Sequence, residues 1–139
     1  MIVLDTHVLS EVLQPTPDRG VINWLGTLPP TSVFTTSVTQ AELLYVARLL
    51  PQGKLRSALL KALALIFSDD FQGRVLDFDY KSAEAFSIIA ADRKNIGNPI
   101  SQFDAMIAAI ARNHGASLAT RNAKDFVDCG ITIINPWEF

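Results

Sequence analysis

Short apolar runs alternate with segments of helical periodicity from one end of the chain to the other. Runs rich in aliphatic and β-branched residues predict strands at 2–4, 33–37, 75–78, 117–120 and 131–134. Between them, apolar residues recur at helical spacing, which predicts helices from about residue 7 and over 21–28, 39–50, 55–67, 81–93 and 101–114. This alternation predicts an α/β fold, in which a mostly parallel sheet of about five strands is flanked by helices.

Length and composition bear on the number of domains and on the kind of partner that the protein can attract. With 139 residues, of which 49% are hydrophobic, the chain is predicted to fold as a single domain over 1–139 with a substantial core. Its 12 Lys and Arg against 14 Asp and Glu give a formal charge of -2. No overall basic field would attract nucleic acid, so an anionic partner must be held locally.

Cysteine usage and hydropathy bear on the cellular compartment. The single cysteine, Cys129, excludes an internal disulfide and a cysteine-rich zinc site, and it fits a reducing cytoplasm. The chain opens without a basic targeting region, and its most apolar later run, 62–67, is too short to span a bilayer. We therefore expect a cytoplasmic protein without a membrane-spanning segment.

The first strand runs directly into Asp5, which places a carboxylate at the end of a buried strand. In open α/β sheets, ligands bind outside the carboxyl ends of the strands, so this position favours a functional role. Asp is also a good N-cap, and capping of the following helix is an equal alternative for this residue taken alone.

Two further acids, Glu42 and Asp104, lie near the starts of predicted helices. Each shares a helical face with apolar residues three, four and seven positions further on, so both faces are predicted to point toward the core. The alternative is structural, because 39–42 and 101–104 both match the capping box, in which the third helical residue reaches back to the cap. For either acid alone, the capping role is the stronger interpretation.

The three acids together change this interpretation. No Lys or Arg lies on the faces that carry Asp5, Glu42 and Asp104, and buried carboxylates close to one another cannot all stay ionised without a cation. Ligands that are all oxygen atoms favour Mg²⁺ or Mn²⁺, which leave positions for a substrate phosphate. Arg121 and Lys124 follow the strand that should end beside this site. They are candidates for RNA phosphate contacts, with a solvated turn as the equal alternative.

Four segments carry a resemblance to a known family. They are Leu-Asp-Thr-His-Val at 4–8, Thr-Gln-Ala-Glu-Leu at 39–43, Phe-Asp-Ala-Met-Ile-Ala-Ala at 103–109 and Ala-Thr-Arg-Asn-Ala-Lys-Asp-Phe at 119–126. In order and spacing they resemble a PIN-domain ribonuclease, and more narrowly the VapC-type toxins of bacterial toxin–antitoxin pairs. Chains of the FitB branch of these toxins also end in a strand followed by Asn-Pro-Trp, here at 135–137. The resemblance covers the whole chain.

The resemblance implies a PIN-like three-layer sandwich and a role for each matched residue. Asp5, Glu42 and Asp104 would form the acidic triad that holds Mg²⁺ or Mn²⁺. Thr6 would support the water shell of the metal, and Asn122 would position water or phosphate.

Two positions depart from the family pattern. His7 stands where the family generally has Asn, and Asn122 stands where many members have a fourth Asp. Asp125, three residues further on, is either a substitute for that acid or a brace for its own turn.

The resemblance also implies an activity and partners. The expected activity is that of a toxin, a Mg²⁺- or Mn²⁺-dependent endoribonuclease that hydrolyses phosphodiester bonds in a structured RNA, tRNA above all. A VapB-like antitoxin would block the cleft and bind operator DNA, so contact with DNA would be indirect. A metal-dependent DNase and a catalytically silent PIN module that binds RNA or an antitoxin are the alternatives. An Asp-nucleophile phosphatase is disfavoured, because His7 stands where its second Asp would be.

The helices at 39–50 and 55–67 carry more apolar residues than one core face requires. These residues would form a homodimer surface or an antitoxin groove, and an ordinary core under a helix pair is the equal alternative. The leucines concerned are Leu44, Leu49, Leu50, Leu59, Leu60 and Leu63.

Overall fold

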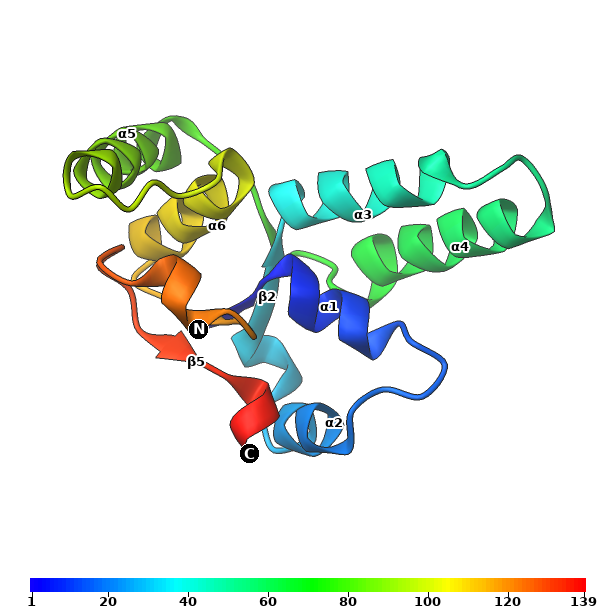
Figure 1. The fold of residues 1–139 in the computed structure, drawn as a ribbon. Helices are drawn as coiled ribbons and strands as arrows, with labels where there is room; N and C mark the ends of the chain where they lie inside the picture. Colours follow the sequence, from blue (N-terminus) through cyan, green and yellow to red (C-terminus); the bar gives the residue numbers. More distant parts are fainter.

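The structure, a computed structural model of residues 1–139, contains one sheet of five parallel strands (Figure 1). The strands lie in the order β3-β2-β1-β4-β5, and every neighbouring pair is parallel. Their bounds are β1 Ile2–Leu4, β2 Val33–Thr36, β3 Val75–Leu76, β4 Ser117–Ala119 and β5 Ile133–Ile134. The predicted α/β fold with a parallel sheet of about five strands is confirmed.

Six α-helices surround the sheet, close to the predicted positions. They are α1 Thr6–Val12, α2 Arg19–Gly26, α3 Ser37–Leu49, α4 Lys54–Leu65, α5 Tyr80–Asn95 and α6 Gln102–Asn113. After α4 the chain widens into a π-helical turn at Ile66–Asp70, so the predicted helix over 55–67 ends early. None of the helices has the length and apolar character needed to cross a membrane.

The sheet separates two hydrophobic clusters, which makes the fold three layers. Successive residues of a strand point to opposite faces, so Val3 and Leu118 pack with α5 and α6, whereas Leu4 and Ala119 pack with α1 to α4. Figure 1 shows α5 and α6 on one side of the sheet and the other four helices on the opposite side. The central strands are therefore buried on both faces, as the continuous apolar runs predicted.

The centre of the sheet is the point where the strand order reverses. β1 pairs with β2 on one side and with β4 on the other, with Val3 beside Phe34 and Leu118. In such sheets, ligands bind outside the carboxyl ends of the strands at this switch point. Asp5 follows β1 at that end of the sheet.

The apolar face of α3 that carries Glu42 does not point toward the core, and the prediction for this face was wrong. Tyr45, Val46 and Leu49 are 64%, 58% and 65% exposed. The reason is that α3 and α4 pair side by side and extend beyond the sheet, so no layer covers this face of α3 (Figure 1). By contrast, the predicted core-facing stripe of α6 is confirmed, because the residues that follow Asp104 on its face are buried.

The leucines of this helix pair divide between core and surface. Leu63 is buried, and Leu44, Leu59 and Leu60 pack partly buried against the cluster under α1 to α4. For these four the ordinary-core interpretation is confirmed. Leu49 is exposed and remains available for a partner.

A buried arginine ties the loops on the α6 side of the sheet together. Arg93 of α5 is only 2% exposed and makes no ion pair. Its Nε donates to the carbonyl of Asn98 at 2.7 Å, and its Nη1 donates to the carbonyls of Asp125 and Val127 at 2.8 and 3.0 Å. The Sγ of Cys129 lies 3.6 Å from the same nitrogen. Arg93 thus joins the segment before α6 to the turn after β4.

We predict that Arg93→Met lowers the free energy of unfolding by about 2 kcal/mol, because it removes the donor of three partly buried carbonyls from a buried position. Urea unfolding measures the change. Lys94→Met, at the exposed neighbouring position of the same helix, is the matched control and should change stability by less than ~0.5 kcal/mol. Equal losses in the two variants would contradict the structural role of Arg93.

Candidate active site

Asp5 is held at the junction of β1 and α1 by its backbone and by one of its carboxylate oxygens. Its N–H donates to the carbonyl of Ala119 at 3.0 Å, and its Oδ1 accepts from the N–H of Val8 at 2.9 Å. Asp5 is therefore the N-cap of α1. The other oxygen, Oδ2, faces the Nδ1 of His7 at 3.8 Å and makes no hydrogen bond. Capping and a role in the site are compatible, since each uses a different oxygen.

Glu42 is not part of a capping box. The cap of α3 is Thr36, whose Oγ1 accepts from the N–H of Thr39, so the helix begins before the predicted cap at Thr39. Glu42 lies further along the helix and accepts from the hydroxyl of Thr6 at 2.8 Å. The capping interpretation is wrong for this acid, because β2 ends in residues that themselves cap the helix.

Hydroxyl groups form a chain that ends on Glu42. The Oγ1 of Thr36 donates to that of Thr39 at 3.3 Å, and the Oγ1 of Thr39 lies 3.1 Å from that of Thr6. Because Thr6 uses its single hydroxyl proton on Glu42, Thr39 must be the donor to Thr6. The chain joins β2, α1 and α3 around one carboxylate oxygen. Sequence reasoning assigned Thr6 and missed Thr36 and Thr39, although the run Thr-Thr-Ser-Val-Thr at the end of β2 was a signal.

Asp104 stands in the first turn of α6 behind the cap Ser101. The Oγ of Ser101 accepts from the N–H of Asp104 at 3.2 Å, whereas no backbone N–H donates to the Asp104 carboxylate in return. Half of the predicted capping box is therefore present, and it leaves the carboxylate available. Asp104 and Asp125 both line a polar hollow next to Arg93. Asp125 braces its turn through its backbone, since its N–H donates to the carbonyl of Asn122 and its carbonyl accepts from Arg93.

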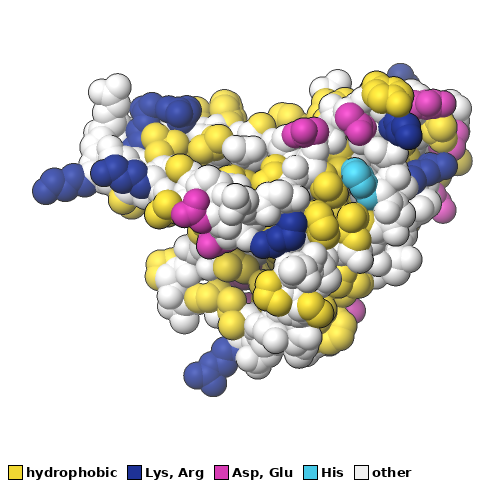
Figure 2. Space-filling view, turned by 180° about the vertical axis from the view of Figure 1, so that it is seen from behind, with side chains coloured by type: hydrophobic (Ala, Val, Ile, Leu, Met, Phe, Trp, Pro, Cys, Tyr) yellow, Lys and Arg dark blue, Asp and Glu magenta, His cyan; other side chains and the backbone are white.

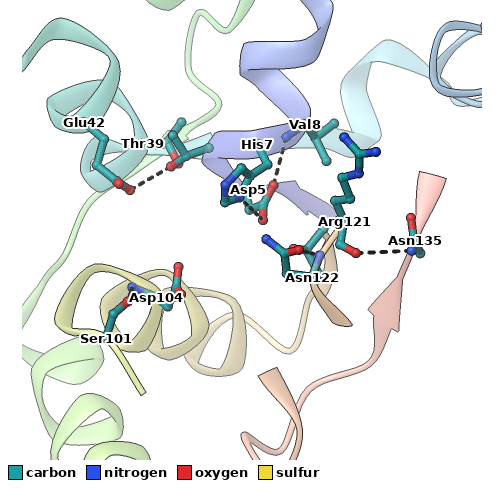
Figure 3. A network of polar contacts seen from close by, with 12 residues as sticks. Asp5, His7, Val8, Thr39, Glu42, Ser101, Asp104, Arg121, Asn122 and Asn135 are labelled. Carbon is teal, nitrogen blue, oxygen red and sulfur yellow. Dashed lines mark hydrogen bonds and ion pairs between the residues drawn. The ribbon is translucent and has the colours of Figure 1, made fainter. Parts of the chain in front are cut away.

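The turn after β4 carries the remaining predicted residues. The N–H of Asn122 donates to the Oγ1 of buried Thr120 at 3.1 Å, and the side-chain amide of Asn122 makes no hydrogen bond within the protein. Figure 3 shows Asn122 near Asp5, with the side chain of Arg121 directed away from the acids. The guanidinium carbon of Arg121 lies 5.0 Å from the centre of the Trp137 ring. Lys124 is exposed on the short helix Ala123–Phe126 and makes no ion pair.

Electrostatics couple the acids to one another. Burial raises the pKa of Glu42, and the nearby charges of Asp104 and Asp5 raise it further, against the hydrogen bond from Thr6 and the attraction of His7. Burial also raises the pKa of Asp104, helped by Asp125 and Asp5 and opposed by Ser101 and His7. No Lys or Arg makes an ion pair with any of these acids. Figure 2 shows Lys and Arg scattered separately over one face of the molecule.

His7 is the basic side chain that faces the Asp5 carboxylate. The Asp5 carboxylate beside it raises the pKa of His7, as do the charges of Asp104 and Glu42, whereas partial burial lowers it. Because its side chain is 60% exposed, it meets both the acids and the solvent. A protonated His7 therefore partly neutralises the cluster.

The donor set fits a hydrated divalent cation rather than a closed metal cage. Figure 3 shows Asp5, Glu42 and Asp104 arriving from three elements around one open space. No three acidic, His or Cys side chains lie close enough together to enclose an ion. Mg²⁺ usually keeps several waters and binds through one or two carboxylates, so an open arrangement of unpaired oxygens suits it.

The comparisons with known proteins agree with this geometry. Residues 2–129 match the family model for the PIN domain. VapC ribonuclease Y4jK of Sinorhizobium fredii is 37% identical over 99% of both chains, and toxin FitB of Neisseria gonorrhoeae is 36% identical over the same shares. The crystal structure of FitAcB from Neisseria gonorrhoeae superposes with a TM-score of 0.93 over 100% of both chains, at 36% identity.

Fold, site and matches together define a PIN-domain nuclease. Within this family the chain belongs to the VapC-type toxins, in the group that includes FitB. The family assignment made from the sequence motifs is thereby confirmed.

We predict that the Asp104→Asn variant distinguishes a metal-binding role of Asp104 from a role at the helix terminus only. Because folding raises the pKa values of Glu42 and Asp104, the folded chain binds their protons more tightly than the unfolded chain does. In EDTA, stability should therefore fall as pH rises from the ordinary carboxyl range through these raised pKa values. Asp104→Asn should show a smaller fall, melt at or above wild type near neutral pH, and gain much less from Mg²⁺.

Paired melting curves across pH, in EDTA and in Mg²⁺, measure these effects. If Asp104 acts only at the helix terminus, its loss should cost ~0.3 to 1 kcal/mol regardless of metal. An unchanged Mg²⁺ response in the variant would return Asp104 to a purely structural role.

Proposed function

We propose that this chain is the toxin of a type II toxin–antitoxin pair and acts as a Mg²⁺- or Mn²⁺-dependent endoribonuclease. One observation carries the proposal: Asp5, Glu42 and Asp104 surround one space at the carboxyl end of the sheet without a Lys or Arg partner. The relatives support it, since one is a VapC ribonuclease and another a toxin. A structured RNA such as tRNA is the substrate we propose, and the cytoplasm is the expected location.

Each residue has a role that its contacts support. Asp5 and Asp104 would hold the metal through unpaired oxygens, and Glu42, restrained by Thr6, would hold it directly or through water. The unbonded amide of Asn122 would orient water or a phosphate oxygen. When bound, a divalent ion at this site would activate water and neutralise charge that develops on the phosphate.

We predict that the purified chain cuts RNA in Mg²⁺ or Mn²⁺ and that EDTA abolishes cutting. Asp104→Asn should lower the rate by about 100-fold or more, because it removes a charge that positions the metal. Incubation with total RNA, followed by mapping of the cut ends, measures activity and identifies the substrate.

Two controls sharpen this experiment. Asp92→Asn, at an exposed position on α5, should cut as wild type does. Single- and double-stranded DNA should remain intact. Undiminished cutting in EDTA would exclude the metal role, and cutting of DNA in place of RNA would favour the DNase alternative.

We further propose that the exposed face of α3 binds a second copy of the chain. The three large apolar residues of this face, Tyr45, Val46 and Leu49, are exposed, and so are Leu55 and Leu65 of the paired helix α4. Exposed apolar surface beyond what a monomer ordinarily shows marks interaction sites. A cognate VapB-like antitoxin is the other proposed partner, and DNA contact would come only through that antitoxin.

We predict that Val46→Glu together with Leu49→Glu converts a dimer into monomers, because the two charges would be desolvated in the interface. Light scattering of the chain alone measures the molecular mass. Ile88→Glu, which introduces a charge at an exposed apolar position of α5, should leave the mass unchanged. A wild-type chain that is monomeric at all concentrations tested would contradict the dimer and leave the face to the antitoxin.

A further inference from the structure

A small polar hollow opens beside the acidic site, and the roles assigned so far do not use it. Its volume is about 210 Å³, and five of its six lining residues are not hydrophobic. One wall is built by α1 and the turn that follows it, and the other by the turn after β4 and the C-terminal segment. The lining residues are His7, Ser10, Glu11, Gln14, Arg121 and Trp137.

The first wall is a polar stripe along α1 and the turn that follows it. Ser10 and Glu11 follow His7 at i+3 and i+4, so these three residues share one face of α1, and Gln14 lies just beyond the end of the helix. The stripe begins at the acidic site, because the Nδ1 of His7 lies 3.8 Å from the Oδ2 of Asp5. A polar stripe on a helix is ordinarily a solvated face. This one differs because an aromatic ring and a guanidinium face it across the hollow.

The opposite wall is a stacked pair that the C-terminal motif holds in place. The guanidinium of Arg121 lies over the ring of Trp137, with its central carbon 5.0 Å from the ring centre. Asn135 restrains both residues, since its Nδ2 donates to the carbonyl of Arg121 at 3.3 Å and its Oδ1 accepts from the N–H of Trp137 at 3.0 Å. The motif at 135–137 therefore positions both members of this stack.

The chemistry of the two walls suits an unpaired nucleobase. Bases stack on aromatic rings and on the planes of Arg guanidinium groups. The carboxylate of Glu11, the amide of Gln14 and the hydroxyl of Ser10 offer acceptors and donors for the edge of a base. Glu11 opposes a phosphate group in this hollow, and Arg121, which would attract one, is held over the Trp137 ring.

We propose that this hollow binds one base of the RNA substrate, from a nucleotide next to the bond placed at the acidic site. The hollow thereby contributes to the choice of the sequence that is cut. The inference rests on the proposed endoribonuclease function, because it takes its ligand from an RNA strand whose scissile phosphate would lie at the acidic site.

Binding to RNA, measured apart from cutting, tests this proposal. The parent protein is the Asp104→Asn chain in Mg²⁺, and the probes are fluorescently labelled single-stranded oligonucleotides of adenosine, cytidine or uridine, plus a uridine oligonucleotide with one guanosine. Anisotropy titrations should show about a tenfold difference in affinity between the best and the worst probe. Glu11→Gln combined with Gln14→Ala should reduce this difference to less than about threefold.

The matched control pairs Glu84→Gln with Gln72→Ala, the same residue types at exposed positions outside the hollow. This control should keep the discrimination of the parent. Equal affinity of the parent for all four probes, or full discrimination in the Glu11/Gln14 variant, would overturn the proposal. Cutting by the wild-type chain is scored separately, so a chain that discriminates bases but never cuts RNA would reject the endoribonuclease function and retain the base site.

Discussion

The burial of the Asp5 carboxylate at the end of the central strand is the constraint around which the rest of the site is arranged. Asp5 is 2% exposed, and its backbone and one oxygen are held by Ala119 and Val8. A buried charge is costly unless its oxygens are satisfied, and here the second oxygen finds only His7, at 3.8 Å. Because β1 is paired on both sides, the chain cannot easily move this carboxylate into solvent. A cation is the simplest way to compensate it.

The acidic cluster opposes the stability of the fold that presents it. Burial and mutual repulsion raise the pKa values of Glu42 and Asp104, so ionising them works against the folded state. The hydroxyl of Thr6 on Glu42 and the imidazole of His7 offset part of this effect. Sites that bind metal and substrate commonly retain such unfavourable groupings, and the surrounding structure must compensate for them.

Two structural ties hold the rims of the site on either side of the acids. Arg93 joins the segment before α6 to the turn after β4, and thereby supports Asp104 and Asp125. Asn135 joins the C-terminal segment to Arg121. The two ties are alike, because each uses side-chain donors on backbone carbonyls and leaves the site carboxylates unpaired. The loops around the site are therefore fixed in place, and the charges of the acids are not neutralised.

The local sequence pattern was sufficient to predict the strands, the helices and the candidate acids. Burial of a strand on both faces and the spacing of apolar residues along a helix both depend on residues that are close together in the sequence. The α3 face that carries Glu42 is exposed because α3 and α4 extend past the sheet. How far a helix extends beyond its neighbours cannot be told from nearby residues in the sequence. The capping interpretation failed at Glu42 because Thr36 began the helix first. Arg93, the hydroxyl chain to Glu42 and the Arg121–Trp137 stack join residues far apart in the sequence, so only the tertiary structure could decide them.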